Sequence, residues 1–371
     1  MKKTLLAAAL LAGFAGVAQA ETSVTLYGII DTGLGYNKIS GGSKHGIENG
    51  SRFGMINGVQ NGSRWGLRGT EDLGDGLQAV FQLESGFNSG NGRSAQGGRL
   101  FGRQATVGLQ SEAWGRLDLG RQTNIASKYF GSIDPFGAGF GQANIGMALS
   151  AANTVRYDNM VMYQTPSFSG FQVGVGYAFD AVSENDFKTN NNTRAITAGI
   201  RYVNGPLNVA FAYDQLNPGS DTTDANVKPR QYSIGASYDF EVVKLGLAYA
   251  RTTDGWFSSM GVNGNDEIST VGYGMEFANN FKANSYMVGL SAPIGGASKL
   301  FGSWQMVDPS NDRLAGKGSG ADEKMNIFSL GYTYDLSKRT NLYAYGSYAK
   351  NYAFYDDLKS TAVGVGVRHR F

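Results

Sequence analysis

The feature that most constrains the fold of this chain is an alternation of apolar and polar residues over segments of about ten residues. In the segment 171–179 the odd positions hold phenylalanine, valine and tyrosine, whereas the even positions hold glutamine, glycine and alanine. The segments 24–36 and 77–87 repeat the pattern. A period of two predicts β-strands whose two faces meet different environments.

The same pattern predicts sixteen strands, separated by connections that are alternately short and long. The candidate strands span 24–36, 61–70, 77–87, 99–109, 115–122, 154–164, 171–179, 194–203, 207–214, 230–240, 243–251, 284–292, 298–306, 325–336, 340–349 and 361–371. The long connections, such as 37–60, 123–153 and 252–283, are polar and rich in Gly, Asn, Asp and Ser. An even number of strands with short turns at one end and long loops at the other is typical of a transmembrane β-barrel. A soluble β-sandwich shares the alternation but does not sort its connections so strictly.

Composition narrows the class further. The chain has no cysteine, which excludes disulfides, thiolate metal sites and cysteine nucleophiles. After position 17 no uninterrupted apolar run is long enough for a membrane-spanning helix. Many candidate strands end in Tyr, Phe or Trp, and such rings form the interfacial girdles of membrane barrels. These features favour an all-β barrel in a membrane.

The first 20 residues predict a secretory signal peptide. They contain Lys2 and Lys3, an apolar run, and an Ala-Gln-Ala end before Glu21. Residues 21–371 then form the barrel, with 30 basic and 30 acidic side chains, because Lys2 and Lys3 are the only charges of the leader. A neutral balance argues against nucleic acid as a partner. Export together with a barrel pattern places the protein in the outer membrane.

Several motifs make the chain resemble the general porins of Gram-negative outer membranes, in particular the neisserial and betaproteobacterial branch. They are Val-Thr-Leu-Tyr-Gly at 24–28, Ser-Arg-Trp-Gly-Leu-Arg-Gly-Thr-Glu-Asp-Leu-Gly-Asp-Gly at 63–76, Leu-Gly-Arg-Gln at 119–122, Tyr-Asp-Leu-Ser-Lys-Arg-Thr at 334–340 and the terminal Phe371. The resemblance implies a 16-stranded antiparallel barrel, a homotrimer, and a third external loop folded into the pore. The expected partners are outer-membrane lipid, lipopolysaccharide, and small hydrophilic solutes and ions.

The third loop corresponds to residues 123–153. Relatives often carry Pro-Glu-Phe-Gly-Gly in this loop, whereas this chain reads Asp-Pro-Phe-Gly-Ala at 134–138. Asp134 is therefore the only carboxylate in the loop. A connection of this length inside an ordered domain requires a reason, and a position inside the lumen supplies one.

Opposite that loop the family places arginines on the barrel wall, and the matching positions are Arg64, Arg103 and Arg156. Periodicity independently supports a lumen-facing orientation for Arg64, Arg68 and Arg156, which alternate with apolar or aromatic neighbours. Arg103 falls in phase with the apolar face of its strand, so a position at the rim or a local bulge is expected. An arginine facing lipid near mid-membrane costs about 2–4 kcal/mol, so an arginine on a spanning strand should face the lumen or lie at a membrane interface.

These residues predict passive diffusion through a water-filled channel, with a transverse field between Asp134 and the wall arginines. Rings of basic side chains favour anions, so we expect weak anion preference. Four wall carboxylates, at Asp31, Glu84, Asp118 and Asp158, oppose it. The last strand, ending at Phe371, is expected to pair with the first, because an unpaired edge in lipid leaves backbone groups unsatisfied.

Other functions remain open at this stage. A channel of the same fold with a specific site for a sugar, phosphate or nucleotide has the same sequence features, and an anchor, an adhesin or an outer-membrane hydrolase is a further class. The only histidines, His45 and His369, lack the partners of a metal site or a nucleophile, and no catalytic or phosphate-loop motif is present. We therefore expect no enzymatic activity, cofactor or metal.

Overall fold

The computed structural model describes residues 23–182, 191–219, 226–260 and 273–371. These residues form seventeen strands in one antiparallel sheet. The strands are β1 (Ser23–Ser40), β2 (Gly50–Asn57), β3 (Arg64–Gly74), β4 (Leu77–Gly86), β5 (Gln104–Ser111), β6 (Gly115–Thr123), β7 (Arg156–Gln164), β8 (Phe171–Ala178), β9 (Arg194–Asn204), β10 (Leu207–Asn217), β11 (Arg230–Asp239), β12 (Lys244–Trp256), β13 (Glu276–Pro293), β14 (Ser298–Pro309), β15 (Met325–Asp335), β16 (Thr340–Lys350) and β17 (Lys359–Arg370). The predicted signal peptide, residues 1–20, lies outside the described residues and stays a prediction.

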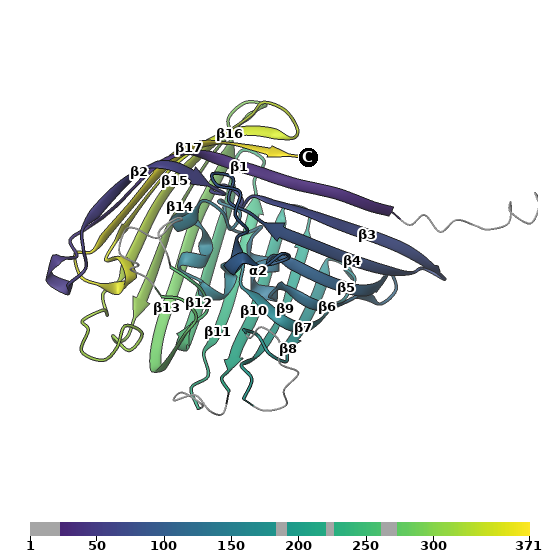
Figure 1. Cartoon of the computed structure of the whole chain (residues 1–371), viewed down its shortest axis with the longest axis horizontal. Helices are drawn as coiled ribbons and strands as arrows, with labels where there is room; N and C mark the ends of the chain where they lie inside the picture. Colours follow the sequence, from purple (N-terminus) through teal and green to yellow (C-terminus); the bar gives the residue numbers. More distant parts are fainter. Residues whose placement is uncertain (1–22, 183–190, 220–225, 261–272) are drawn as a thin grey trace, which may run out of the picture.

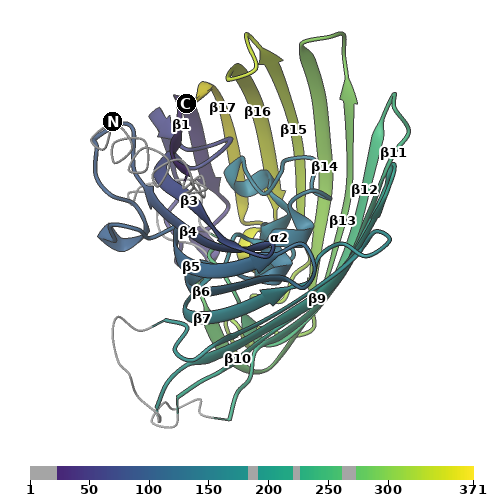
Figure 2. The same ribbon diagram turned by 90° about the vertical axis from the view of Figure 1, so that its right-hand side faces the viewer.

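The sheet closes on itself between β1 and β17, which pair from Ile29 opposite Arg370 to Ser40 opposite Lys359. The other edge of β1 is shared, because β3 pairs with residues 23–29 and β2 pairs with residues 32–39. The two segments β2 and β3 therefore occupy one strand position, and the seventeen segments make a barrel of sixteen positions. The predicted 16-stranded antiparallel barrel is confirmed. Both ribbon views show the strands curving around a common interior (Figures 1 and 2).

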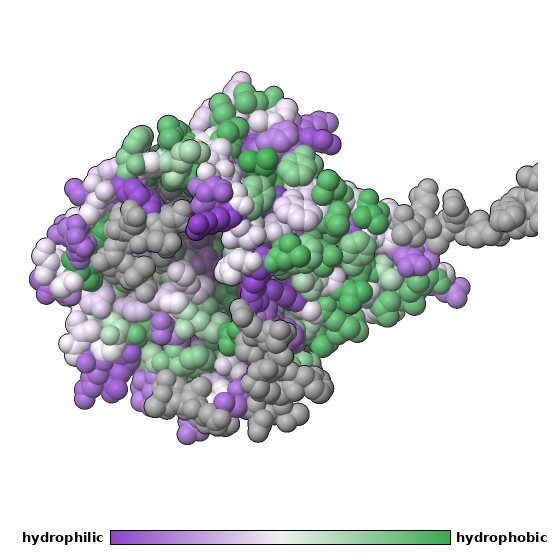
Figure 3. Space-filling view, in the orientation of Figure 1, coloured by the Kyte–Doolittle hydropathy of each residue, from purple (hydrophilic) through white to green (hydrophobic). Residues whose placement is uncertain are grey.

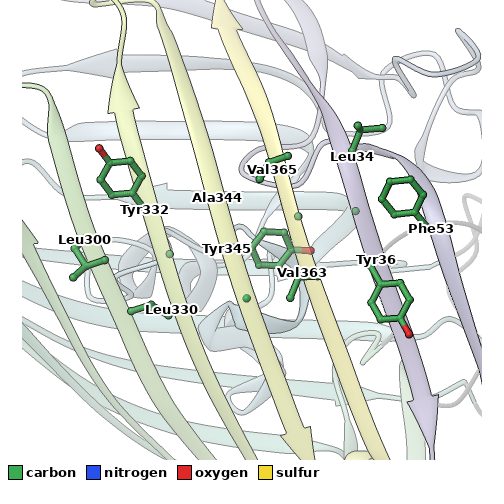
Figure 4. Close-up of a pocket in the computed structure, with 14 residues that line it drawn as sticks. Leu34, Tyr36, Phe53, Leu300, Leu330, Tyr332, Ala344, Tyr345, Val363 and Val365 are labelled. Carbon is green, nitrogen blue, oxygen red and sulfur yellow. The ribbon is translucent and has the colours of Figure 1, made fainter.

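The period of two sorts side chains between the outer wall and the lumen. In β8 the outward residues Val173 and Val175 are exposed, whereas Gly176 and Ala178 face inward and are buried. Figure 4 shows the outer wall over β14–β17 and β1, where aliphatic and aromatic side chains such as Leu330, Tyr332 and Val365 stand side by side. Lipid accepts this face because it is apolar, and the sheet pairs the backbone polar groups of neighbouring strands with each other.

The inner side contrasts with this wall. In the space-filling view the molecule is hollowed near its centre, with hydrophilic residues beside the opening and a hydrophobic area over the strands to its right (Figure 3). Within the described residues no helix is long and apolar enough to span a membrane.

The structure differs from the sequence prediction at two long connections. Residues 50–57, expected to be part of a loop, form β2, and residues 276–283, also expected to be a loop, form the start of β13. In the second case the alternation is interrupted by a register shift between Thr253 and Gly255 and by the left-handed backbone of Asn280. A β-bulge changes which face a residue occupies, so a search for period two stops there.

Helical structure is confined to short segments, most of them between β6 and β7. The segments are α2 (Ile125–Phe130), η1 (Ser43–His45), η2 (Gln96–Gly98), η3 (Gly141–Ala143), η4 (Ile145–Met147), η5 (Ser150–Ala152) and η6 (Tyr352–Phe354). Both ribbon views place α2 within the outline of the barrel (Figures 1 and 2). The predicted infolded third loop is confirmed.

The terminal residue completes the seam of the barrel. The backbone N–H of Phe371 donates to the carbonyl of Gly28, and the N–H of Gly28 donates to the carbonyl of Phe371, both at 3.1 Å. The Phe371 ring covers Gly28 so closely that a Cβ at that position would lie less than 3.0 Å from it. The seam therefore depends on a bare backbone at position 28 and a ring at position 371.

Deletion of Phe371 should destabilise the folded barrel by about 1–3 kcal/mol, because two backbone hydrogen bonds worth about 0.5–1.5 kcal/mol each are lost together with the contact of the ring. The measurement is urea unfolding in detergent micelles, followed by the heat-modifiable migration of the folded barrel. Phe371→Tyr, which keeps the backbone pair and the ring, is the control and should unfold at the same urea concentration as the wild type. Equal midpoints for the deletion and the wild type would refute this role.

Candidate functional site

The third loop, which connects β6 to β7, is fixed inside the barrel through Asn124. This residue caps α2, and its side chain accepts a hydrogen bond from the backbone N–H of Ser127 at 3.2 Å. Its amide donates to the carboxylate of Asp214 on β10 at 2.7 Å and to the carbonyl of Ala151 at 2.8 Å. One side chain thus joins the start of the loop, its end and the wall.

The wall beneath the loop is lined with glycine. A Cβ at any of five lumen-facing glycines would lie less than 3.0 Å from an atom of the loop; these are Gly174, Gly199, Gly235, Gly246 and Gly289. At Gly246 the atom approached is the backbone carbonyl of Ile133, which cannot rotate away as a side chain would. The missing side chains therefore allow the loop to lie directly against the strands.

Aromatic rings hold the far part of the loop. Phe140 packs against Phe301 at a ring centroid distance of 5.4 Å, against Tyr343 at 5.5 Å and against Tyr345 at 5.6 Å. Phe136 contacts Phe301 edge to face at 4.9 Å. Aromatic pairs of this geometry contribute about 0.5–1.5 kcal/mol to stability beyond the burial of their area. The loop is therefore held against β14 and β16 by ring packing, as well as against β10 by hydrogen bonding.

A cluster of arginines lies on the strands β3, β6 and β7 and on the segment that precedes β5. The three family positions, Arg64, Arg103 and Arg156, come together here, because the Arg156 Nε donates to the carbonyl of Arg103 at 2.9 Å, and Arg103 and Arg64 approach one carboxylate. Arg103 lies immediately before β5, which begins at Gln104. The alternation of inward and outward residues along the strand therefore does not determine the direction of its side chain.

Two further arginines, Arg99 and Arg121, belong to the same cluster, and sequence reasoning missed them. Both pair with Asp158, Arg99 at 2.7 Å and Arg121 at 2.6 Å. The Arg121 Nε also donates to the carbonyl of Gly102, beside Arg103. The Leu-Gly-Arg-Gln motif contained Arg121, but it carried the resemblance rather than a site assignment.

Two carboxylates partly neutralise the cluster. Glu84 accepts a hydrogen bond from Arg103 Nε at 2.7 Å and lies 3.8 Å from Arg64 Nη1, while Asp158 pairs with Arg99 and Arg121. Five guanidinium groups against these two carboxylates leave three positive charges. Arg156 forms no ion pair within the described residues and binds only carbonyl oxygens, of Arg103 and Thr154.

Backbone carbonyls fix the direction of three of these side chains. The Nε of Arg64 donates to Gly62 at 2.9 Å, that of Arg121 to Gly102 at 2.8 Å and that of Arg156 to Arg103 at 2.9 Å. A guanidinium anchored through Nε presents its remaining N–H groups in a fixed plane. The positive charges are therefore positioned rather than mobile.

Arg68, which sequence periodicity grouped with Arg64, takes a separate place. It lies over the ring of Tyr27, with 5.3 Å from its Cζ to the ring centroid, and forms no ion pair in the part of the chain that the structure describes. It lies four positions after Arg64 on an extended strand, which corresponds to about 13 Å. Arg68 therefore faces the lumen away from the cluster.

Asp134 has a role different from the lumen-facing charge expected from the sequence. Its two oxygens accept hydrogen bonds from the backbone N–H groups of Phe136, Ala138 and Ile145 at 2.9–3.0 Å, and the residue is only 5% exposed. Burial raises the pKa of the Asp134 carboxyl to about 6, despite these three hydrogen bonds. The loop carboxylate therefore fastens the loop to itself and is not presented to the arginines.

Among the wall carboxylates, Asp31 is also structural. It is fully buried, and its oxygens accept hydrogen bonds from the N–H groups of Val59 and Asn61 and from the hydroxyl of Tyr343 at 2.8 Å. These contacts hold the chain where β2 passes into β3, immediately before Arg64. Asp118 forms an ion pair with Arg116 at 2.7 Å. With Asp31 buried and Asp118 paired, neither of these two carboxylates is available to attract cations.

The described residues contain no group of side chains arranged to bind a metal ion. No group of three or more His, Cys, Asp or Glu side chains lies close enough to hold a metal ion. His45 binds the carbonyl of Asp356 at 2.8 Å, and His369 binds the hydroxyl of Thr340 at 2.8 Å. Both histidines connect neighbouring segments of the chain.

A closed barrel with an apolar outer wall and a loop-narrowed lumen lined by arginine defines a membrane channel of the outer-membrane type. The chain belongs to the Gram-negative porin family, whose model matches residues 7–353. It is 72% identical, over the full length of both chains, to an outer membrane porin protein of Bordetella pertussis. It is 33% identical, again over both full lengths, to outer membrane porin protein 32 of Delftia acidovorans.

Solved structures agree with this assignment. An anion-selective porin from Comamonas acidovorans superposes with a TM-score of 0.71 at 30% identity, covering 95% of this chain and all of that one. OmpF of Salmonella typhi, at 19% identity and a TM-score of 0.68, shows the shared fold. The predicted family, the outer-membrane location and the function as a porin for passive diffusion are confirmed, and the relatives are channel proteins.

Gly246→Ala should destabilise the barrel by about 1–3 kcal/mol and lower its conductance, because the added Cβ meets the carbonyl of Ile133 and forces the loop away from the wall, into the lumen. Single-channel recording and urea unfolding measure the two effects. Gly346→Ala is the matched control, since its Cβ would meet only Val363, at an ordinary 3.5 Å. If both variants conduct like the wild type, the loop does not depend on this contact.

Asp134 predicts a pH dependence of stability. Because the folded-state pKa of about 6 lies above the unfolded value of about 3.9, the protonated carboxyl contributes stability below pH 3.9, and this contribution is lost as the pH rises through about 6. Between pH 4 and pH 7 the free energy of unfolding of the wild type should therefore fall by about 2–3 kcal/mol relative to that of Asp134→Asn. Urea titrations of both proteins at several pH values provide the test, and parallel curves would contradict it.

Proposed function

We propose that this porin conducts small hydrophilic solutes and ions with a weak preference for anions. The observation that carries the proposal is the arginine cluster, in which five guanidinium groups face two carboxylates. A cluster with excess positive charge beside a water-filled lumen raises the local concentration of anions. The similarity to the anion-selective porin from Comamonas acidovorans supports the same preference.

Transport in this proposal requires no covalent step and no energy input. The third loop sets the width of the channel. The anchored guanidinium groups of Arg64, Arg121 and Arg156 provide a fixed electrostatic field, so a permeating ion passes without any rearrangement of these side chains. Glu84 and Asp158 keep the net charge small, so the preference is weak. The electrostatic field acts between the charged groups of the wall and the passing ion. It does not run from the arginines to Asp134, because that carboxylate is hydrogen-bonded within the loop.

The proposal includes the remaining expectations for the mature protein. Residues 21–371 form the barrel after removal of the leader, and the protein works without a cofactor and without enzymatic activity. It assembles as a homotrimer in contact with lipid and lipopolysaccharide. The outer wall offers an apolar surface for such assembly, with a depression of about 530 Å³ lined by Leu34, Phe53, Leu300 and Val363 among others (Figure 4).

Replacing Arg64 and Arg156 together by alanine should move the chloride-to-potassium permeability ratio towards one and raise the conductance, because two of the three excess positive charges and two bulky side chains are removed. Reversal potentials in a salt gradient across a planar bilayer measure the ratio.

Two controls separate charge from structure. The double lysine variant at the same positions keeps the charge and should retain the preference, and Arg313→Ala, at an exposed position in the connection between β14 and β15, should behave as the wild type. Cation preference in the wild-type channel would overturn the proposal, and an unchanged ratio in the double alanine variant would remove these arginines from the filter.

A further inference from the structure

A second polar pocket lies at the turn end of the barrel, on the wall that carries the third loop. It has a volume of about 850 Å³ and is lined by lumen-facing residues of four consecutive strands together with Ser132 of the loop. The polar strand residues of the lining are Arg201 on β9, Asn208 on β10, Ser237 and Asp239 on β11, and Lys244 on β12, which is directly opposite Asp239. The arginine cluster, on β3, β6, β7 and the segment before β5, is a separate feature.

The register of the sheet brings these side chains together. Asn208 is directly opposite Ser237, and Ser237 is directly opposite Gly246, which carries no side chain. Lys244 is two residues from Gly246, and Arg201 is two residues from Val203, the partner of Asn208. Direct cross-strand neighbours have Cβ atoms about 4.5–5.5 Å apart, and diagonal neighbours are about 7–8 Å apart. Asn208 and Ser237 therefore form the floor, with one cation on each side.

The loop holds this arrangement in place. Lys244 Nζ donates to the carbonyl of Ser132 at 2.9 Å, and the Asn208 amide donates to the Ser132 hydroxyl at 2.9 Å. The guanidinium of Arg201 lies 5.3 Å from the ring centroid of Tyr129 and donates to the Gln172 side chain at 3.3 Å. Both cations are thus fixed against the same stretch of loop.

Several polar groups of the pocket have no hydrogen-bond partner among the residues that the structure describes. The Asn208 Oδ1, the Ser237 Oγ and the Arg201 Nε are buried without a hydrogen bond, and Ser237 and Asn208 are 2% and 9% exposed. Within the described residues neither Arg201 nor Lys244 is within 4.0 Å of a carboxylate oxygen. Native proteins rarely leave buried polar groups unpaired, because each costs about 1–3 kcal/mol.

The free groups are both donors and acceptors. Arg201 and Lys244 supply positive charge, the Ser237 hydroxyl can donate, and the Asn208 Oδ1 can only accept. The orientation of that amide follows from Ser132, whose hydroxyl donates to the Tyr129 carbonyl and therefore receives the Asn208 N–H. Two carboxylates, Asp239 and Glu241, also line the pocket at the turn between β11 and β12, and they make a doubly charged anion unfavourable.

We propose that this pocket binds a singly charged oxyanion that retains a proton, which is the chemistry of the phosphate monoanion. Arg201 and the Ser237 hydroxyl hold its oxygens, Lys244 balances its charge, and the Asn208 Oδ1 accepts its O–H. The site rests on the proposed anion-conducting function, because it would be filled by anions that have passed the arginine cluster or that enter from the turn side.

The test uses inorganic phosphate as a blocker of the chloride current through the full-length protein in a planar bilayer, at a pH near 6. The expected result is a saturable reduction of the current, with half-saturation at a lower concentration when phosphate is added on the turn side than on the loop side. Sulfate and acetate, which carry no proton at this pH, should act at least several-fold more weakly. A linear effect, or an equal effect of all three anions, would overturn the proposal.

Variants locate the effect. Arg201→Gln should weaken phosphate block about tenfold, since a charge-assisted hydrogen bond is lost. Because Arg201 also contacts Tyr129, Ser237→Ala is a second variant that leaves the loop contacts intact, and it should weaken the block severalfold while chloride conductance and permeability ratio stay unchanged. Arg313→Gln is the control. If phosphate blocks both pocket variants as strongly as it blocks the wild type, the assignment of the site is wrong. If the wild-type channel instead shows no preference for anions, the proposed function is wrong.

Discussion

The requirement that every backbone polar group within hydrocarbon be paired determines most of this structure. It forces β17 to meet β1, and it gives the last residue a place in the seam through its hydrogen bonds with Gly28. Because the wall is closed and faces lipid on its outside, a segment that narrows the channel has to lie in the lumen. The third loop occupies the lumen, and three arginines of the cluster, Arg64, Arg121 and Arg156, lie on strands that the closed wall keeps in fixed register.

Much of the fold could be predicted from the sequence because lipid and water impose opposite demands on alternate residues. The segment 171–179 shows this clearly, and it lies within one residue of β8. The prediction of strands failed at β2 and at the start of β13, where this alternation is short or interrupted. In β2 the alternation is limited to two outward apolar residues, Phe53 and Met55, and around Asn280 a left-handed residue interrupts it. A search for a period of two has too little to detect in the first case and stops in the second.

The site was predictable only in part, for a related reason. Strand phase indicated that Arg64 and Arg156 face inward, and the resemblance added Arg103. Arg99 could not be found in this way, because it lies outside regular structure and reaches Asp158 across 59 positions of sequence. The role of Asp134 depends on three backbone N–H groups that meet it only after the loop has folded. Contacts between distant segments, and turns formed by the backbone, leave no periodic trace in the sequence.

The glycine-lined wall beneath the loop has an evolutionary consequence. A side chain at any of these five wall positions would force an atom of the loop to move, so substitution on that side of the channel also displaces the loop. Variation in permeability among descendants of this protein should therefore accumulate in the loop and on the opposite strands, while the supporting wall stays constant.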